Sequence, residues 1–154
     1  ATDYPEQQLV SVDLKGEDKR EHLYGADKVQ EYRLSHDKKW IAFVEQYNVY
    51  VAPFADLGKR QNLNTSSKSM PLKKLSSRAG EYLNWSPDNQ TVSWFHGPRF
   101  FERDLKDAFE FVDGAPEELP KIDTEGVNLS FKHKTDKPEG YKALVGGNVV
   151  TMKN

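Results

Sequence analysis

The stretch LSHDKKWIAF at residues 34–43 decides the fold, because its pattern recurs as WSPDNQTVSW at residues 85–94. In both copies a Ser-x-Asp turn precedes an apolar run. Serine and aspartate side chains bond to nearby backbone N–H groups and so stabilise a reversal of the chain. The matched pairs, each 51 residues apart, are Ser35 with Ser86, Asp37 with Asp88, Ile41 with Val92, and Phe43 with Trp94. A turn and strand that recur at a fixed spacing indicate a repeat architecture.

Apolar and polar residues alternate along most of the chain, which predicts β-strands with one buried face. The clearest runs are residues 40–44 (WIAFV) and 48–53 (NVYVAP), both rich in β-branched and aromatic residues. For residues 105–112 (LKDAFEFV), the periodicity leaves a helical turn and a strand both open. Further strands are predicted at residues 8–13, 20–24, 31–34, 61–63, 81–85, 91–95, 99–104 and 127–133.

A repeat of roughly 40 to 50 residues with four short strands is typical of a β-propeller blade. Blade-like units are predicted at about residues 8–24, 27–64 and 81–133, with 61–63 as a fourth, outer strand. The serine-rich, basic residues 65–77 are predicted to form a long surface loop. The chain is therefore predicted to be all-β, with fewer blades than the roughly four to eight that a closed propeller needs. It would form a partial β-propeller of about two to three four-stranded antiparallel blades, and the alternative is a β-sandwich in which one hairpin recurs by chance.

The composition argues against several classes of partner. The formal net charge of −2 gives no global field toward nucleic acid or an anionic membrane. No apolar run approaches the roughly 20 residues needed to span a bilayer. The chain contains 0 cysteines, so disulfides and thiolate metal sites are excluded. No nucleic-acid partner and no membrane span are therefore predicted.

The repeated turn resembles a known signature. SHDKKWIAF at residues 35–43 resembles the S-P-D-G-K-x-I-A-F motif of TolB-like (PD40, WD40-like) propeller repeats, with His36 in place of the proline and Lys38 in place of the glycine. WSPDN at residues 85–89 departs from the motif only at the glycine. Residues 47–54 (YNVYVAPF) and the WFHGP stretch that begins at Trp94 are similar to propellers fused to bacterial amidohydrolase-like proteins.

The C-terminal residues agree with this resemblance. KALVGGNVVTM at residues 142–152 has a hairpin signature, with Gly-Gly-Asn between two apolar runs, and is similar to the opening strand pair of an amidohydrolase domain. The resemblance therefore implies a propeller over residues 1–140 and the start of an amidohydrolase-type domain at 141–154. The chain begins ATDYP, without an initiator methionine or a signal peptide, so we expect a processed or truncated start.

The function implied by the resemblance is that of a non-catalytic propeller, which acts as a scaffold or substrate-access domain. Its partner would be the catalytic domain of the same parent protein, a metal-dependent C–N bond hydrolase that uses a divalent metal such as zinc. The resemblance also implies a periplasmic or exported protein. The alternative is a TolB-like module that binds a protein or peptide and has no associated enzyme. Open blade edges also predict self-association.

No catalytic, cofactor-binding or metal-ligating residue is predicted within this chain. The histidines, His22, His36, His96 and His133, form no His-x-His pair of the kind with which amidohydrolase metal sites begin. Carboxylates at residues 102–110 alternate with Arg103 and Lys106, which favours a solvated edge over a glycosidase-like carboxylate pair. Five aromatic residues are predicted to pack between blades rather than to line a ligand funnel: Trp40, Phe43, Trp85, Trp94 and Phe95.

Overall fold

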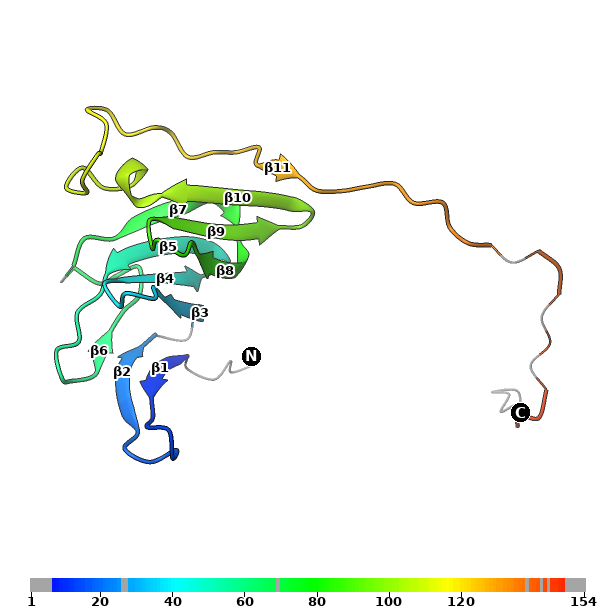
Figure 1. Ribbon diagram of the computed structural model, residues 1–154, viewed down its shortest axis with the longest axis horizontal. Helices are drawn as coiled ribbons and strands as arrows, with labels where there is room; N and C mark the ends of the chain where they lie inside the picture. Colours follow the sequence, from blue (N-terminus) through cyan, green and yellow to red (C-terminus); the bar gives the residue numbers. More distant parts are fainter. Residues whose placement is uncertain are drawn as a thin grey trace.

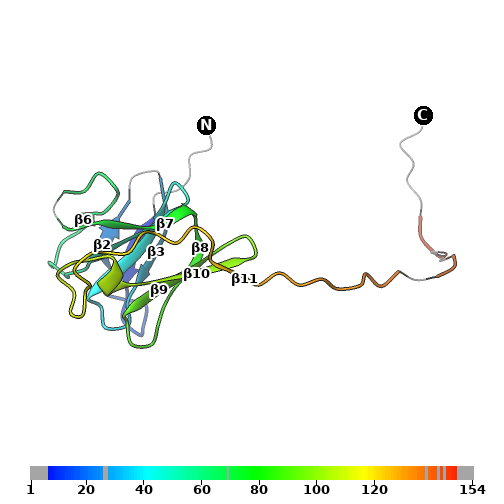
Figure 2. The same cartoon turned by 90° about the horizontal axis from the view of Figure 1, so that it is seen from above.

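The computed structural model describes residues 7–25, 28–68, 70–137, 139–141, 143 and 145–148. Within these residues the chain is all-β, apart from one short 3-10 turn, η1 (Leu105–Asp107). Three sheets form successive layers, and residues after β11 lead away from them (Figures 1 and 2). No helix in this part of the chain has the length and apolar character needed to cross a bilayer.

The three sheets follow one another along the chain, except that β6 of the first sheet comes between two strands of the second. Sheet A, in spatial order, contains β1 (Gln8–Ser11), β2 (Arg20–Tyr24) and β6 (Gln61–Asn62). Sheet B contains β3 (Val29–Leu34), β4 (Trp40–Glu45), β5 (Asn48–Pro53) and β7 (Lys73–Ala79). Sheet C contains β8 (Glu81–Trp85), β9 (Thr91–His96), β10 (Arg99–Asp104) and β11 (Val127–Asn128). Sheets B and C are antiparallel throughout, whereas β6 runs parallel to β2 in sheet A.

The first Ser-x-Asp turn, between β3 and β4, is held by its own side chains. Ser35 Oγ donates to Asp37 Oδ1 at 2.6 Å and accepts the backbone N–H of Trp40 at 3.0 Å. The backbone N–H of Lys38 donates to the Ser35 carbonyl at 3.0 Å, and Lys38 has a positive φ of 60°. The serine and aspartate therefore shape the turn as the sequence predicts.

The second Ser-x-Asp turn, between β8 and β9, repeats these bonds. Ser86 Oγ donates to Asp88 Oδ1 and accepts the backbone N–H of Thr91 at 2.9 Å. The backbone N–H of Asn89 donates to the Ser86 carbonyl at 2.9 Å, and Asn89 has a φ of 61°. The two turns are thus equivalent bond for bond.

The equivalence continues through the hairpin that follows each turn. Trp40 pairs with Pro53 across β4 and β5, and Thr91 pairs with Asp104 across β9 and β10. Past each hairpin, the next backbone N–H returns to the turn: Phe54 donates to Lys39 at 2.7 Å and Leu105 donates to Gln90 at 2.8 Å. The predicted repeat is therefore a repeat of backbone structure as well as of sequence.

Two predicted segments differ from the structure. Gln61–Asn62 does not complete sheet B; it pairs with β2 in sheet A, and β7 takes the fourth place in sheet B. The predicted surface loop at 65–77 is wrong from Lys73 onward, where β7 begins. The reason is that Leu75 and Ser76 are each only 1% exposed, and Ser76 Oγ accepts the backbone N–H of Val49 at 2.9 Å.

The C-terminal predictions have mixed outcomes. Residues 105–112 begin with η1 rather than a strand, and only Val127–Asn128 of the predicted strand at 127–133 is paired. In the predicted hairpin at 142–152, residues 142, 144 and 149–152 lie outside the described residues. Its described residues, 143 and 145–148, are not in a strand.

Two apolar cores separate the three sheets. The core between sheets A and B contains Leu23, Val29, Ile41, Phe43, Ala52 and Leu63. The core between sheets B and C contains Ala42, Val44, Val49 and Val51 from sheet B, and Leu83, Trp85, Val92, Trp94 and Phe101 from sheet C. Leu75, Leu105, Ala108 and Phe109 complete the second core. Sheet B is consequently buried on both faces.

Candidate functional site

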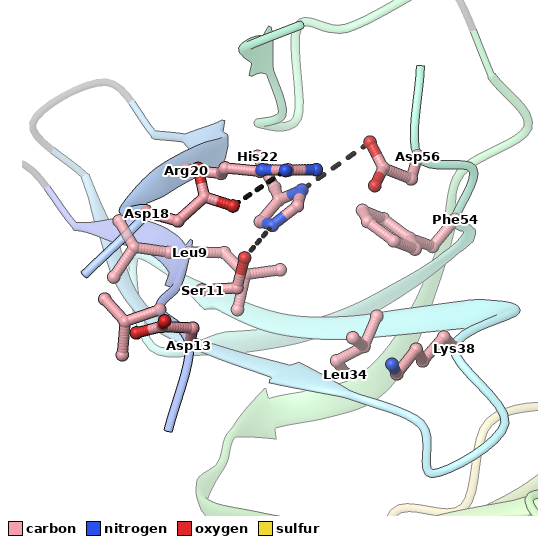
Figure 3. A pocket seen from close by; sticks show the side chains of 12 residues that line it. Leu9, Ser11, Asp13, Asp18, Arg20, His22, Leu34, Lys38, Phe54 and Asp56 are labelled. Carbon is pink, nitrogen blue, oxygen red and sulfur yellow. Dashed lines mark hydrogen bonds and ion pairs between the residues drawn. The ribbon is translucent and has the colours of Figure 1, made fainter. Parts of the chain in front are cut away.

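A cavity of about 490 Å³ lies between sheet A and one end of sheet B (Figure 3). The consecutive residues 9–13 form one wall, and Leu34, Lys38 and Phe54 of sheet B and its connections form the other. The remaining lining residues are Asp18, Arg20, His22 and Asp56. The cavity therefore lies beside β1 and the residues that follow it, with Arg20 and His22 of the neighbouring strand β2 also in its lining.

A serine, a histidine and an aspartate lie in line beside this cavity (Figure 3). Ser11 Oγ and His22 Nε2 are hydrogen-bonded at 2.7 Å. On the other side of the ring, His22 Nδ1 lies 3.6 Å from Asp56 Oδ1. Ser11 and His22 come from the neighbouring strands β1 and β2, and Asp56 from the loop after β5.

This arrangement has the residue types of a nucleophilic hydrolase but lacks part of the required geometry. In such an enzyme a buried aspartate accepts a hydrogen bond from histidine Nδ1 and thereby orients the ring. Here the distance of 3.6 Å is too long for a hydrogen bond, and the Asp56 side chain is 57% exposed. Asp56 Oδ1 instead accepts the backbone N–H of Gly58 at 2.9 Å. The geometry therefore describes a polar wall of a binding groove better than an activated serine.

The charge of Asp56 is stabilised locally. The Gly58 N–H lowers the pKa of the Asp56 carboxyl below its ordinary value, and the nearby His22 ring acts in the same direction. The carboxylate is therefore ionised at neutral pH, although it is open to solvent. An ionised, accessible carboxylate can bind a cationic group from outside the chain.

The other histidines lie apart from this cavity. His36 is in the first Ser-x-Asp turn, His96 pairs with Arg99 at the end of the β9–β10 hairpin, and His133 is exposed. Among the described residues, no group of three or more His, Cys, Asp or Glu side chains is placed to hold a metal ion. The histidines therefore share no common site in this part of the chain.

Four of the five aromatic residues pack in the cores between the sheets: Phe43, Trp85 and Trp94 are buried there, and Trp40 is partly buried against the second core. Phe43 is 0% exposed, and Trp85 and Trp94 are each 3% exposed. Trp85 also crosses between sheets, because its Nε1–H donates to the Arg33 carbonyl of β3 at 2.9 Å. Phe95 is only partly buried and contacts Phe100, with ring centroids 5.3 Å apart.

The acidic residues near the end of β10 are engaged locally rather than paired with each other. Asp104 Oδ1 accepts the Thr91 hydroxyl at 2.6 Å, and Asp104 Oδ2 lies 3.5 Å from Lys106 Nζ. Glu102 is exposed on β10. These contacts are those of a solvated strand end, as the alternating charges predict.

Sequence reasoning did not identify the Ser11, His22 and Asp56 line. The predicted hairpin over residues 8–24 contained a signal for half of it, since it places Ser11 and His22 on neighbouring strands. Asp56 carries no such signal, because the loop after β5 brings it to sheet A only in the folded chain.

Comparisons of the chain with protein-family models, with curated proteins and with solved structures found no match.

Proposed function

We propose that sheets B and C are adjacent blades of a TolB-like β-propeller, and that this propeller is a non-catalytic scaffold or substrate-access domain of an amidohydrolase-type protein. The main support for the propeller is the structural equivalence of sheets B and C. Turn bonds, hairpin register and strand order all recur 51 residues apart, for example at Ser35 and Ser86. The repeat covers sheets that pack face to face.

The direction of packing supports a propeller over a sandwich. Ile41 and Phe43 of sheet B pack toward sheet A, and their equivalents Val92 and Trp94 of sheet C pack toward sheet B. Each of these sheets thus presents the same face to the sheet before it in the chain. Blades repeated about a common axis have this head-to-tail relationship, whereas a two-fold sandwich joins like faces.

A crystal structure of the chain tests the propeller directly. Superposing residues 35–54 on residues 86–105 must require a rotation of about 45° to 90°, the angle between neighbours in a ring of eight to four blades. A rotation near 180° would contradict the proposal, and so would a pure translation.

The link to an amidohydrolase rests on the sequence resemblance and has its own test. The coding sequence beyond Asn154 is expected to encode a His-x-His pair within some tens of residues. The complete gene product is expected to hydrolyse cyclic amides or peptides in a metal-dependent manner. Inactivity across such substrates, with metal present, would contradict this part of the proposal.

The cavity beside β1 favours a second function, that of a module that binds a protein or peptide. It adjoins β1, a strand with one edge unpaired among the described residues, and an extended peptide adds to a sheet at such an edge. Its wall includes Leu9, Leu34 and Phe54. A gene product that ends soon after Asn154 would favour this function over the amidohydrolase scaffold.

A further inference from the structure

The outer edge of β1 has no partner among the described residues. Sheet A has the order β1-β2-β6, so β1 pairs on one side only. In a strand, alternate backbone N–H and C=O groups point to each side, and those on a free edge are available to another chain. Val10 and Val12 beside this edge are 41% and 54% exposed. The edge therefore offers both hydrogen-bonding groups and apolar surface.

The groove beside β1 has apolar walls and an acidic rim. Leu9, Leu34 and Phe54 form apolar walls. The charged lining groups are three carboxylates, Asp13, Asp18 and Asp56, and two cations, Arg20 and Lys38. Arg20 is already paired with Asp18 at 2.7 Å. An extended segment with an apolar side chain beside basic residues would complement this groove.

The same chain carries such a segment just after β11. Apolar side chains alternate there and are unburied, with Val127 at 59%, Leu129 at 53% and Phe131 at 86% exposure. Among the described residues, the last backbone–backbone bond of this segment runs from the Leu129 N–H to the Pro98 carbonyl at 2.9 Å, and the chain then leaves the sheets (Figure 1). Lys132, His133 and Lys134 follow immediately and are exposed.

This segment cannot reach β1 of its own chain. Leu129 is fixed to sheet C, and four further residues extend at most about 14 Å. Sheet B lies between sheets A and C, and stacked sheets are about 10 Å apart, so the target lies about 20 Å away. An occupant with this sequence must therefore come from a second molecule.

We propose that residues 129–133 of one copy add as a strand to the free edge of β1 in a second copy. Phe131 enters the groove beside Phe54, and the basic residues lie against its acidic rim. If two copies each add their segment to the other, a closed dimer forms. If each copy adds its segment to the next copy, an open chain of copies forms. This inference does not depend on the propeller proposal, because it uses only the edge of sheet A and the segment after β11.

Sedimentation velocity of the full chain over a concentration series tests this inference. The wild type is expected to associate reversibly, and Phe131→Asp to weaken the association at least about tenfold, since it removes the central apolar contact. Tyr141→Asp is the matched control, because Tyr141 is 108% exposed and lies outside the segment. A wild type that stays monomeric, or a Phe131→Asp chain that associates like the wild type, overturns the proposal.

Disulfide trapping locates the contact. The chain has 0 cysteines, so single substitutions report without background. Val10→Cys chains mixed with Lys132→Cys chains are expected to form a covalent heterodimer faster than Val10→Cys mixed with Tyr141→Cys. Equal rates for the two mixtures would show that the segment does not lie at β1. Asp56→Asn keeps the oxygen that binds Gly58 and is expected to weaken association several-fold. An unchanged association would show that the acidic rim is not part of the contact.

Discussion

The side chain of Asn89 binds the backbone of His36, 53 residues earlier in the chain. Asn89 Oδ1 accepts the His36 N–H at 2.7 Å and lies 3.3 Å from the N–H of Asp37. The two Ser-x-Asp turns are therefore hydrogen-bonded to each other. The repeated sheets are joined by this polar contact at one end as well as by their apolar core.

Asn89→Gly is expected to lower the free energy of unfolding by about 1–2 kcal/mol, because it removes the acceptor of the inter-sheet bond. Glycine keeps the positive φ of 61° accessible, so backbone strain does not contribute. Lys38→Gly is the matched control, since Lys38 holds the equivalent position with a φ of 60°. Urea denaturation checks both variants, and equal losses would show that the Asn89 bond contributes nothing.

Acid is expected to weaken both Ser-x-Asp turns. The Ser35 hydroxyl, then the Lys39 N–H, lowers the pKa of Asp37, and the Ser86 hydroxyl and the Gln90 N–H lower that of Asp88. A lowered folded-state pKa stabilises the fold above the unfolded value of about 3.8, and this contribution is lost as pH falls through the folded pKa. Asp37→Asn with Asp88→Asn should therefore flatten the stability profile below about pH 4. Urea midpoints from pH 7 to pH 2.5 measure it, and a profile as steep as that of wild type would contradict it.

Gly80→Ala is expected to destabilise the fold by about 1–3 kcal/mol, because overpacking forces its neighbours apart. A Cβ at residue 80 would lie 2.3 Å from Val49 Cγ2 and 2.6 Å from Trp94 Cδ1, at the junction of sheets B and C. At Gly147 a Cβ would meet nothing within 4 Å, so Gly147→Ala serves as the control and should be neutral. Thermal unfolding of the two variants measures the difference, and similar midpoints would contradict the packing described.

Glu45→Ala is expected to loosen the loop that carries β6 and to cost about 2 kcal/mol of stability. Glu45 is 6% exposed, and its carboxylate accepts the Thr65 backbone N–H at 2.6 Å and the Thr65 hydroxyl at 2.8 Å. Trypsin should then cleave after Lys68 faster than in the wild type. Glu81→Ala, at an exposed position, should leave the cleavage rate unchanged. An unchanged rate in Glu45→Ala would show that the contact does not hold the loop.

The parts of the fold that depend on local chemistry were predictable. The Ser-x-Asp turns and the strands beside them could be predicted from local sequence, because a hydroxyl and a carboxylate within a few residues of each other stabilise the turn. The strand β7 was not predictable from its pattern, since Leu75 is flanked by lysines and serines. Ser76 is buried there, where its hydroxyl oxygen accepts a hydrogen bond from the N–H of Val49, a partner 27 residues away.

The candidate site was hidden for a related reason. Ser11 and His22 belong to a predictable hairpin, but Asp56 lies in the loop that leads from β5 of sheet B to β6 of sheet A, and the sequence did not predict that β6 joins sheet A. The strand predicted at 127–133 illustrates the converse. Its alternation is genuine, yet β10 provides partners for only its first residues, so the rest has no strand partner among the described residues.

The hydrogen bonds that Asn89 accepts from the first turn have no equivalent at the second turn in the part of the chain that the structure describes. One of them uses the N–H of His36, and the residue at that place in the second turn is Pro87, which has no N–H to give. Of the two positions equivalent to His36 and Asp37, only Asp88 has an N–H. The two turns therefore match in their internal hydrogen bonds and differ in the backbone donors that they offer to a neighbour. Among the described residues, this two-donor contact joins sheets B and C, and Pro87 prevents the second turn from repeating it.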